Sequence, residues 1–166
     1  YTANMAEIGR SLCYYSDAGW GDLVKRGKYE DMSFCSSLVD ACAQLVKRWA
    51  PSPYPEWICC VPSNNTHDLV PDFGQRLSNV LGLEYVQALK KVKNNFEQKK
   101  MQNSVQQVRN LDGAFEVIDS FPDGPCLLVD DMVDSRWTFT YAAYLLTEKG
   151  SGPVFPLALA NTSIGV

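Results

Sequence analysis

Two adjacent carboxylates, Asp130 and Asp131, follow the apolar run 126–129. A short apolar run of this kind predicts a parallel strand that is buried on both faces, so the acids would lie at its carboxyl end. Residues 137–149 then show helical periodicity, and open α/β sheets bind ligands at the carboxyl ends of their strands. The loop 134–138 would present backbone N–H groups at the start of that helix, where a phosphate is favoured. This order of features outlines a nucleotide-sugar site.

Residues 126–138 read Cys-Leu-Leu-Val-Asp-Asp-Met-Val-Asp-Ser-Arg-Trp-Thr, and this pattern resembles the signature of type I phosphoribosyltransferases. The resemblance implies that Asp130 and Asp131 hold the ribose hydroxyls of phosphoribosyl pyrophosphate and contact Mg²⁺ through ligand or water. The loop implied to bind the 5′-phosphate comprises Asp134, Ser135, Arg136, Trp137 and Thr138. Arg136 departs from the pattern, because the family usually has Gly or another small residue there. Its side chain could crowd a bound phosphate or add a cation to it.

The acid pair has two other interpretations. An acidic pair after a strand can be solvated loop, with no ligand. A bacterial receiver domain also has paired acids after its first strand, but several further βα units must follow, and only residues 132–166 remain here. The signature match therefore favours the phosphoribosyltransferase interpretation.

Apolar periodicity along the rest of the chain predicts an α/β protein. Helices are expected at 37–49, 69–81 and 137–149, and strands at 57–62, 83–89, 126–129 and 153–160. Pro153 and Pro156 place the start of the last strand at a sheet edge or entry. Together with the resemblance, this predicts a type I phosphoribosyltransferase fold, with a mainly parallel sheet, helices on both faces and a mobile lid loop. Residues 1–35 are expected to form an irregular N-terminal segment or hood, and 36–166 the core.

Two further segments occupy positions that bind pyrophosphate in that family. The loop after the first core strand contains Ser63, Asn64 and Asn65, although an Asn-rich turn that caps the next helix explains them equally well. A cationic segment stands where the family inserts its lid, and its candidate residues are Lys90, Lys91, Lys93, Gln98, Lys99 and Lys100. Such a charge run is also typical of solvated surface.

A narrower resemblance extends over nearly the whole chain. The segments 17–21, 27–31, 60–63, 98–104 and 130–138 are similar to the C-terminal domain of some bacterial RecQ-type DNA helicases. Residues 101–118 resemble ComF-type phosphoribosyltransferases, and the matching residues are Gln98, Arg109, Asn110, Gly113, Ala114 and Phe115. The resemblance implies an ATP-dependent helicase as parent, with its helicase domains as partners and DNA bound through that parent. No Gly-x-x-x-x-Gly-Lys-Ser/Thr motif occurs, so this segment carries no helicase motor.

Two functions remain open from the sequence. The domain is either an accessory or regulatory module that binds phosphoribosyl pyrophosphate, a nucleotide or a nucleic-acid 5′-phosphate, or an active magnesium-dependent phosphoribosyltransferase that acts on a nucleobase. A fold match supports a site rather than a reaction, and no base-recognition motif is visible, so we favour the module.

Composition sets the remaining expectations for the 166-residue chain. Its net charge of −4 disfavours non-specific binding to the phosphate backbone of duplex nucleic acid. The six cysteines lack metal-ligand spacing and are expected to be reduced core residues, with Cys59 and Cys60 pointing to opposite faces of a strand. The absence of a signal peptide or long apolar run predicts a cytoplasmic protein without membrane contact. Because the chain begins at Tyr1, we expect it to be a piece of a longer protein.

Overall fold

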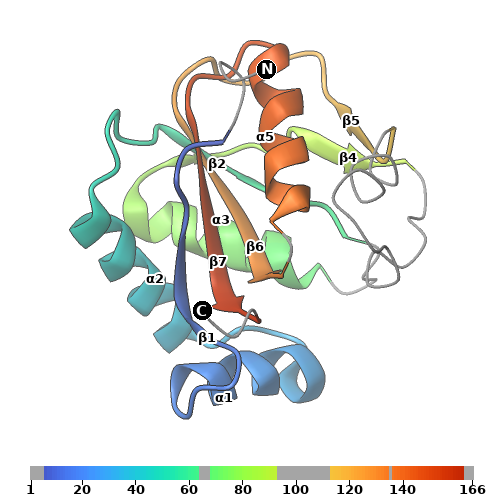
Figure 1. Cartoon of the computed structure of the whole chain (residues 1–166). Coiled ribbons are helices and arrows are strands. Elements are labelled where there is room, and N and C mark those ends of the chain that lie inside the picture. Colours follow the sequence, from blue (N-terminus) through green and yellow to red (C-terminus); the bar gives the residue numbers. More distant parts are fainter. Residues whose placement is uncertain (1–5, 64–67, 93–112, 135, 163–166) are drawn as a thin grey trace.

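The computed structural model describes residues 6–63, 68–92, 113–134 and 136–162. Its centre is a five-stranded sheet in the order β1-β7-β6-β2-β3, and every pair of neighbouring strands is parallel (Figure 1). The strands are β1 (Arg10–Tyr14), β2 (Trp57–Cys60), β3 (Glu84–Tyr85), β6 (Cys126–Val133) and β7 (Val154–Asn161). The predicted α/β class with a mainly parallel sheet is therefore confirmed.

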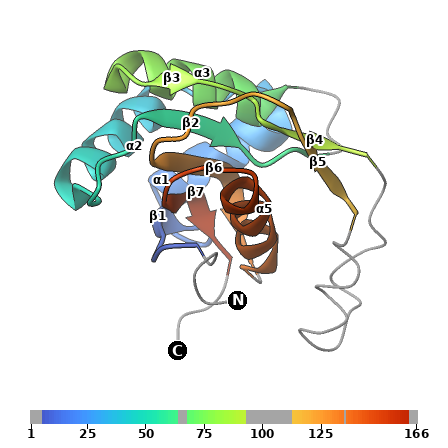
Figure 2. The ribbon, with the colours of Figure 1, turned by 90° about the horizontal axis from the view of Figure 1, so that it is seen from above.

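Helices cover both faces of this sheet (Figure 2). On one face lie α2 (Ser36–Trp49) and α3 (Leu69–Leu81), and on the other lies α5 (Trp137–Glu148). α1 (Trp20–Arg26) lies at the carboxyl edge of the sheet (Figure 1) and packs with the α2 and α3 side of the core. A π-helical turn, Gly27–Asp31, continues directly from α1. Among the described residues, no helix is both long and apolar enough to cross a membrane.

The sheet divides the core into two apolar clusters, because successive side chains of a strand point to opposite faces. Leu127 and Val129 pack with the helices α1 to α3, whereas Cys126 and Leu128 pack with α5. Cys60 and Cys59 divide in the same way, as predicted. All six cysteines are free thiols. Five of them are buried, which confirms these five as core residues, whereas Cys35 is partly exposed.

The helices that follow from periodicity agree with the expected ranges. α2 and α3 each turn one apolar face to the sheet, and both end at a residue in the left-handed conformation. Gly82, the predicted stop of α3, has φ 69°, and its N–H donates to the Ser78 carbonyl. Glycine suits this position because it lacks the Cβ that strains a left-handed backbone.

Two expectations about the strands were wrong. The segment predicted to be irregular contains β1, which pairs with β7 from Arg10 opposite Leu157. The single strand expected at 83–89 is two short strands, β3 in the main sheet and β4 (Leu89–Lys91) in a second one. In both cases the neighbouring strand, which local periodicity does not reveal, decides the pairing.

The expectation for Pro156 agrees with the register. β7 is an interior strand, but β1 begins only opposite Leu157, so Pro156 pairs with β6 alone and the start of β7 lies at an edge.

The second sheet is an antiparallel ribbon of β4 and β5 (Phe115–Val117). Lys90 and Lys91, expected in the lid loop, form part of β4 and pair with Glu116 and Phe115. The ribbon is fixed to α5, where the Tyr141 hydroxyl accepts a hydrogen bond of 3.0 Å from the Gly113 N–H. The remaining candidate lid residues, Lys93, Gln98, Lys99 and Lys100, lie outside the described residues.

Candidate functional site

The two carboxylates lie within the second half of β6 rather than after its end. β2 stops at Cys60, opposite Val129, so Asp130 is the first residue of β6 beyond the end of β2. On the other side β6 stays paired with β7, where Asp130 faces Ala158. Because β6 extends further than β2, the carboxyl edge of the sheet has a step between these two strands. Open parallel sheets bind ligands at this edge.

The backbone holds the acid pair in a fixed relation. The Asp131 N–H donates a hydrogen bond of 2.8 Å to Asp130 Oδ1. Burial of the Asp130 carboxyl, together with repulsion from Asp131, raises the pKa of Asp130 well above its usual value. Adjacent carboxylates in a poorly solvated position disfavour a second negative charge, so Asp130 retains its proton to higher pH than an ordinary aspartate.

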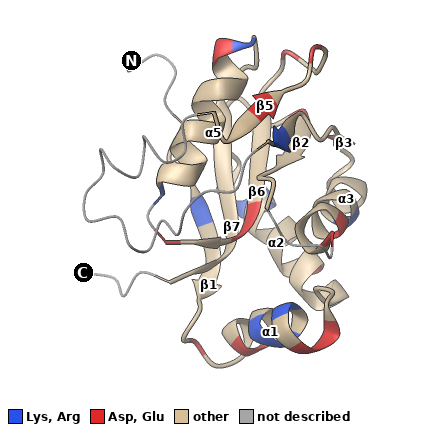
Figure 3. Ribbon diagram, turned by 90° about the vertical axis from the view of Figure 1, so that its right-hand side faces the viewer, with Lys and Arg blue, Asp and Glu red and all other residues tan. Residues whose placement is uncertain are grey.

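A lysine that the sequence did not assign to the site completes the charge arrangement. Lys28 Nζ, from the π-helical turn, lies 3.0 Å from Asp131 Oδ2. It also donates to the Met132 sulfur at 3.5 Å. Nothing local in the sequence relates this lysine to the acids, although it lies within the segment 27–31, which is part of the narrower resemblance. Figure 3 shows the acidic end of β6 and the charged α1 segment in one view.

A second cation approaches from the β4–β5 ribbon. Burial lowers the pKa of Lys91, whereas the nearby Asp130 carboxylate raises it in part. At the end of β2, the Tyr85 hydroxyl donates to Gln87 Oε1 at 2.7 Å. Gln87 Nε2 donates in turn to the carbonyls of Cys60 and Leu89, each at 2.8 Å. This network ties the end of β2 to β4 and so places Lys91 beside the step.

The raised pKa of Asp130 has a measurable consequence for stability. Folded Asp130 binds its proton more tightly than the unfolded chain does, so stability is lost as pH rises through the folded pKa. Asp130→Asn removes this titration, and the variant should be more stable than wild type at about pH 8 and lose that advantage below about pH 3.9. Urea unfolding across this pH range measures the difference. The exposed Asp123→Asn serves as control, and an equal pH-dependent gain there would contradict the expectation.

The loop predicted to bind phosphate leads directly into α5. Asp134 is exposed, Ser135 lies outside the described residues, and Trp137 and Thr138 form the first turn of the helix. Arg136 is the N-cap residue, and its carbonyl accepts hydrogen bonds from the Thr140 N–H at 3.0 Å and the Thr140 hydroxyl at 3.1 Å. Arg136 has φ 66°. A left-handed backbone is suited to glycine, which gives a physical reason for the small residue usual at this family position.

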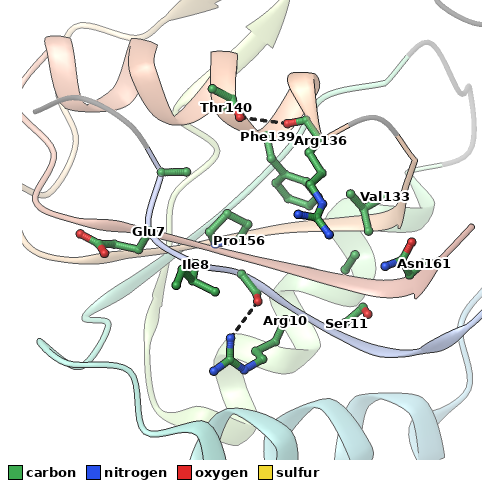
Figure 4. Close-up of a pocket in the computed structure, with 13 residues that line it drawn as sticks. Glu7, Ile8, Arg10, Ser11, Val133, Arg136, Phe139, Thr140, Pro156 and Asn161 are labelled. Atoms are coloured by element: carbon green, nitrogen blue, oxygen red, sulfur yellow. Dashed lines mark hydrogen bonds between the residues drawn. The ribbon is translucent and has the colours of Figure 1, made fainter. Parts of the chain in front are cut away.

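The Arg136 side chain lines a cavity (Figure 4). This cavity has a volume of about 300 Å³ and lies between β1, β7 and the start of α5. Its lining residues are Ala6, Glu7, Ile8, Gly9, Arg10, Ser11, Val133, Arg136, Phe139, Thr140, Pro156, Ala158 and Asn161. Asp130 and Asp131 do not line it, so the structure separates Arg136 from the carboxylates that the sequence grouped with it.

Replacing Arg136 by Gly should stabilise the fold by about 1 kcal/mol. The left-handed conformation costs an L-residue roughly 1–2 kcal/mol, and glycine avoids this cost at some expense in unfolded-state entropy. Urea unfolding of Arg136→Gly and Arg136→Ala separates backbone strain from loss of the side chain. If both variants have the same stability, relief of strain is not the cause.

The other predicted site residues divide in two groups. Ser63 is exposed just after β2, while Asn64 and Asn65 of the same loop lie outside the described residues. Lys91 lies beside the acid pair, whereas Lys90 is exposed on the opposite side of the ribbon strand. The structure therefore brings together Asp130, Asp131, Lys91 and the unpredicted Lys28.

The acid pair fits Mg²⁺ only with help from a ligand. Within the described part of the chain, no group of three or more His, Cys, Asp or Glu side chains gathers around one point. Mg²⁺ commonly binds one or two carboxylates together with waters and substrate phosphates. Asp130 and Asp131 meet that requirement if the phosphates supply the other oxygens.

Neither a protein-family model nor a curated protein matches the chain in sequence. Solved structures do match in fold. Adenine phosphoribosyltransferase from Saccharomyces cerevisiae, complexed with an imino-altritol bisphosphate and adenine, is 18% identical with a TM-score of 0.50, over 75% of this chain and 68% of that one. A hypothetical protein from Neisseria gonorrhoeae with bound ppGpp is 12% identical with a TM-score of 0.50, over 98% of this chain and 77% of that one. The parallel sheet, the helices on both faces and these similarities show that the chain has a type I phosphoribosyltransferase fold.

Proposed function

We propose that this chain is an accessory or regulatory domain that binds a phosphorylated ribose at the carboxyl edge of its sheet. The observation that carries the proposal is the acid pair Asp130 and Asp131, poorly solvated and placed where β6 extends past β2. Carboxylate oxygens in that position can accept hydrogen bonds from the two hydroxyls of a ribose. Candidate ligands are phosphoribosyl pyrophosphate, a nucleotide or a nucleic-acid 5′-phosphate.

The start of α5 is the proposed phosphate position. The helix begins directly after the loop 134–138, and its first turn reads Trp-Thr-Phe-Thr without an acidic side chain. The N–H groups and dipole of a helix N-terminus favour an anion there. Lys91, close to Asp130, supplies positive charge on the other side of the step, where pyrophosphate would extend. If the ligand carries pyrophosphate, a Mg²⁺ held through it and the acid pair would neutralise part of its charge.

The proposed parent of the domain is a RecQ-type DNA helicase. This part of the proposal is supported by the sequence resemblance of segments 27–31, 60–63 and 98–104. The partners would be the helicase domains of the same chain, with DNA bound through them. In that setting, binding of a phosphorylated ribose to this domain, either free or at a nucleic-acid end, would regulate the helicase.

An active phosphoribosyltransferase is the second candidate. The intact acid pair favours it, because both carboxylates implied to hold the ribose are present at the expected edge. Two features favour a binding module instead. Lys28 is already paired with one of the acids, and the Arg136 side chain points into a different cavity.

Calorimetric titration tests the binding of a phosphorylated ribose, which both candidates require. The ligands are phosphoribosyl pyrophosphate with and without Mg²⁺, AMP, ppGpp and a 5′-phosphorylated oligonucleotide, with adenosine as the control without phosphate. 2′,3′-Dideoxy-AMP is the matched control for the ribose contact. A hydrogen bond to a charged group contributes about 1.5–3 kcal/mol to binding. The protein should therefore bind 2′,3′-dideoxy-AMP at least about tenfold more weakly than AMP. Equal affinities would overturn the ribose assignment.

The enzyme alternative has its own measurement. Incubation with phosphoribosyl pyrophosphate, Mg²⁺ and each nucleobase should release pyrophosphate if the domain transfers phosphoribosyl groups. Binding without pyrophosphate release supports the module, and release with any base establishes the enzyme.

A further inference from the structure

The N-terminal helical segment lies across the carboxyl edge of the sheet, beyond the ends of β6 and β7 (Figure 1). This is the side from which a ligand would approach Asp130 and Asp131. The segment, residues 20–31, consists of α1 and the π-helical turn that carries Lys28. Lys28 connects this segment to the acid pair through its contact with Asp131.

Close packing fixes the turn that presents Lys28. A Cβ added to Gly27 would lie 2.7 Å from Phe34 Cδ1 and 2.9 Å from the Ser33 carbonyl oxygen. The Ser33 N–H donates to the Gly27 carbonyl at 3.1 Å, and Met32 closes the turn in the left-handed conformation with φ 52°. π-Helical turns are often found at functional sites. Here the turn directs one lysine at one carboxylate.

The Lys28–Asp131 pair differs in burial from the other ion pairs of the described residues. Its side chains are 24% and 16% exposed, whereas those of Arg26 and Asp31 are 63% and 47% exposed. A pair shielded from water is screened less by solvent and salt, so it holds its partners more firmly than a surface pair does. The contact is therefore suited to fasten the segment to the site.

The same contact takes up acceptor capacity that a ribose would need. Lys28 Nζ lies on Asp131 Oδ2, and the Asp131 N–H already occupies Asp130 Oδ1. Little of Asp131 is left open to solvent. A ribose hydroxyl that approaches Asp131 Oδ2 from the carboxyl edge therefore meets the position where the ammonium now lies.

We propose that Lys28 is an intramolecular competitor of the ligand, because its ammonium holds Asp131 Oδ2 and the ribose hydroxyls would use the same carboxylate. This inference rests on the proposed function. Ligand binding then releases the segment 20–31 from the acid pair. By thermodynamic reciprocity, breaking the Lys28 contact tightens ligand binding by the same factor by which the ligand favours release.

The test compares Lys28→Met with wild type, and Lys47→Met, an exposed lysine on α2, is the matched control. The affinity for AMP is measured by calorimetry. Lys28→Met should bind at least threefold more tightly, whereas Lys47→Met and Lys28→Arg, which retain a cation at position 28, should not. In wild type, saturating AMP should speed amide hydrogen exchange over residues 20–31. Weaker or unchanged binding in Lys28→Met, or slower exchange in the presence of AMP, would overturn the competition.

A second arm needs no ligand. In the free protein, Lys28→Met and Asp131→Asn should each speed exchange over residues 20–31, and the double variant should add nothing further because both remove one contact. Additive or absent effects would show that the pair does not fasten the segment. If AMP and phosphoribosyl pyrophosphate bind to none of the variants, the proposed function fails and the competition with it, whatever the ligand-free arm shows.

Discussion

Simultaneous replacement of Asp130 and Asp131 by Asn should abolish the stabilisation that phosphoribosyl pyrophosphate gives to the folded protein. A ligand at about a hundred times its dissociation constant adds roughly 2.7 kcal/mol to the free energy of unfolding. Asn is close to Asp in shape, so the strand should persist. However, an amide lacks the charge and half of the acceptor oxygens that the hydroxyls require. Thermal or urea unfolding with and without ligand and Mg²⁺ measures the effect.

The control for this experiment changes two aspartates away from the site. Asp119 and Asp123 are exposed and precede β6, at the opposite end from the acid pair. The double variant Asp119→Asn, Asp123→Asn makes the same change in net charge, and it should keep the full stabilisation by ligand. If the acid-pair variant also keeps it, the ribose does not bind at Asp130 and Asp131.

Trp57→Ala should lower the free energy of unfolding by about 3–5 kcal/mol, the usual range for removal of a buried aromatic side chain. Trp57 is 0% exposed at the start of β2. Its ring packs against Phe121, with 5.5 Å between centroids, and its Nε1–H donates to the Gly124 carbonyl at 2.9 Å. One side chain thus supports the core under α5 and the loop that leads into β6. Urea unfolding followed by circular dichroism measures the loss.

Two companion variants separate the contributions. Trp57→Phe keeps an aromatic ring but removes one of the two donors to the Gly124 carbonyl, which still accepts a hydrogen bond from the Gly152 N–H. It should therefore lose less stability than Trp57→Ala. Trp20→Ala removes a tryptophan that is 40% exposed on α1 and should change stability much less than either. A loss from Trp20→Ala as large as that from Trp57→Ala would contradict the role given to burial.

The parts of this protein that sequence alone determined are those set by local burial. The run Cys126–Val129 had to be a buried strand, and the periodic faces of α2 and α3 had to pack on a sheet, because each element must remove its apolar side from water. Gly82 ends α3 because its left-handed backbone suits glycine. The acids then had to emerge near the carboxyl edge, since they follow the apolar part of that strand.

Tertiary structure decided which of these elements became neighbours. β1 has little periodicity and exists as a strand because β7 offers its edge. Pro156 is accommodated inside the sheet because β1 begins only beyond it. Tertiary packing also brings Lys28 to Asp131 and places the Arg136 side chain in a cavity that the acid pair does not line. Contacts between segments far apart in the chain depend on how whole helices and strands pack together, and the local sequence does not determine that packing.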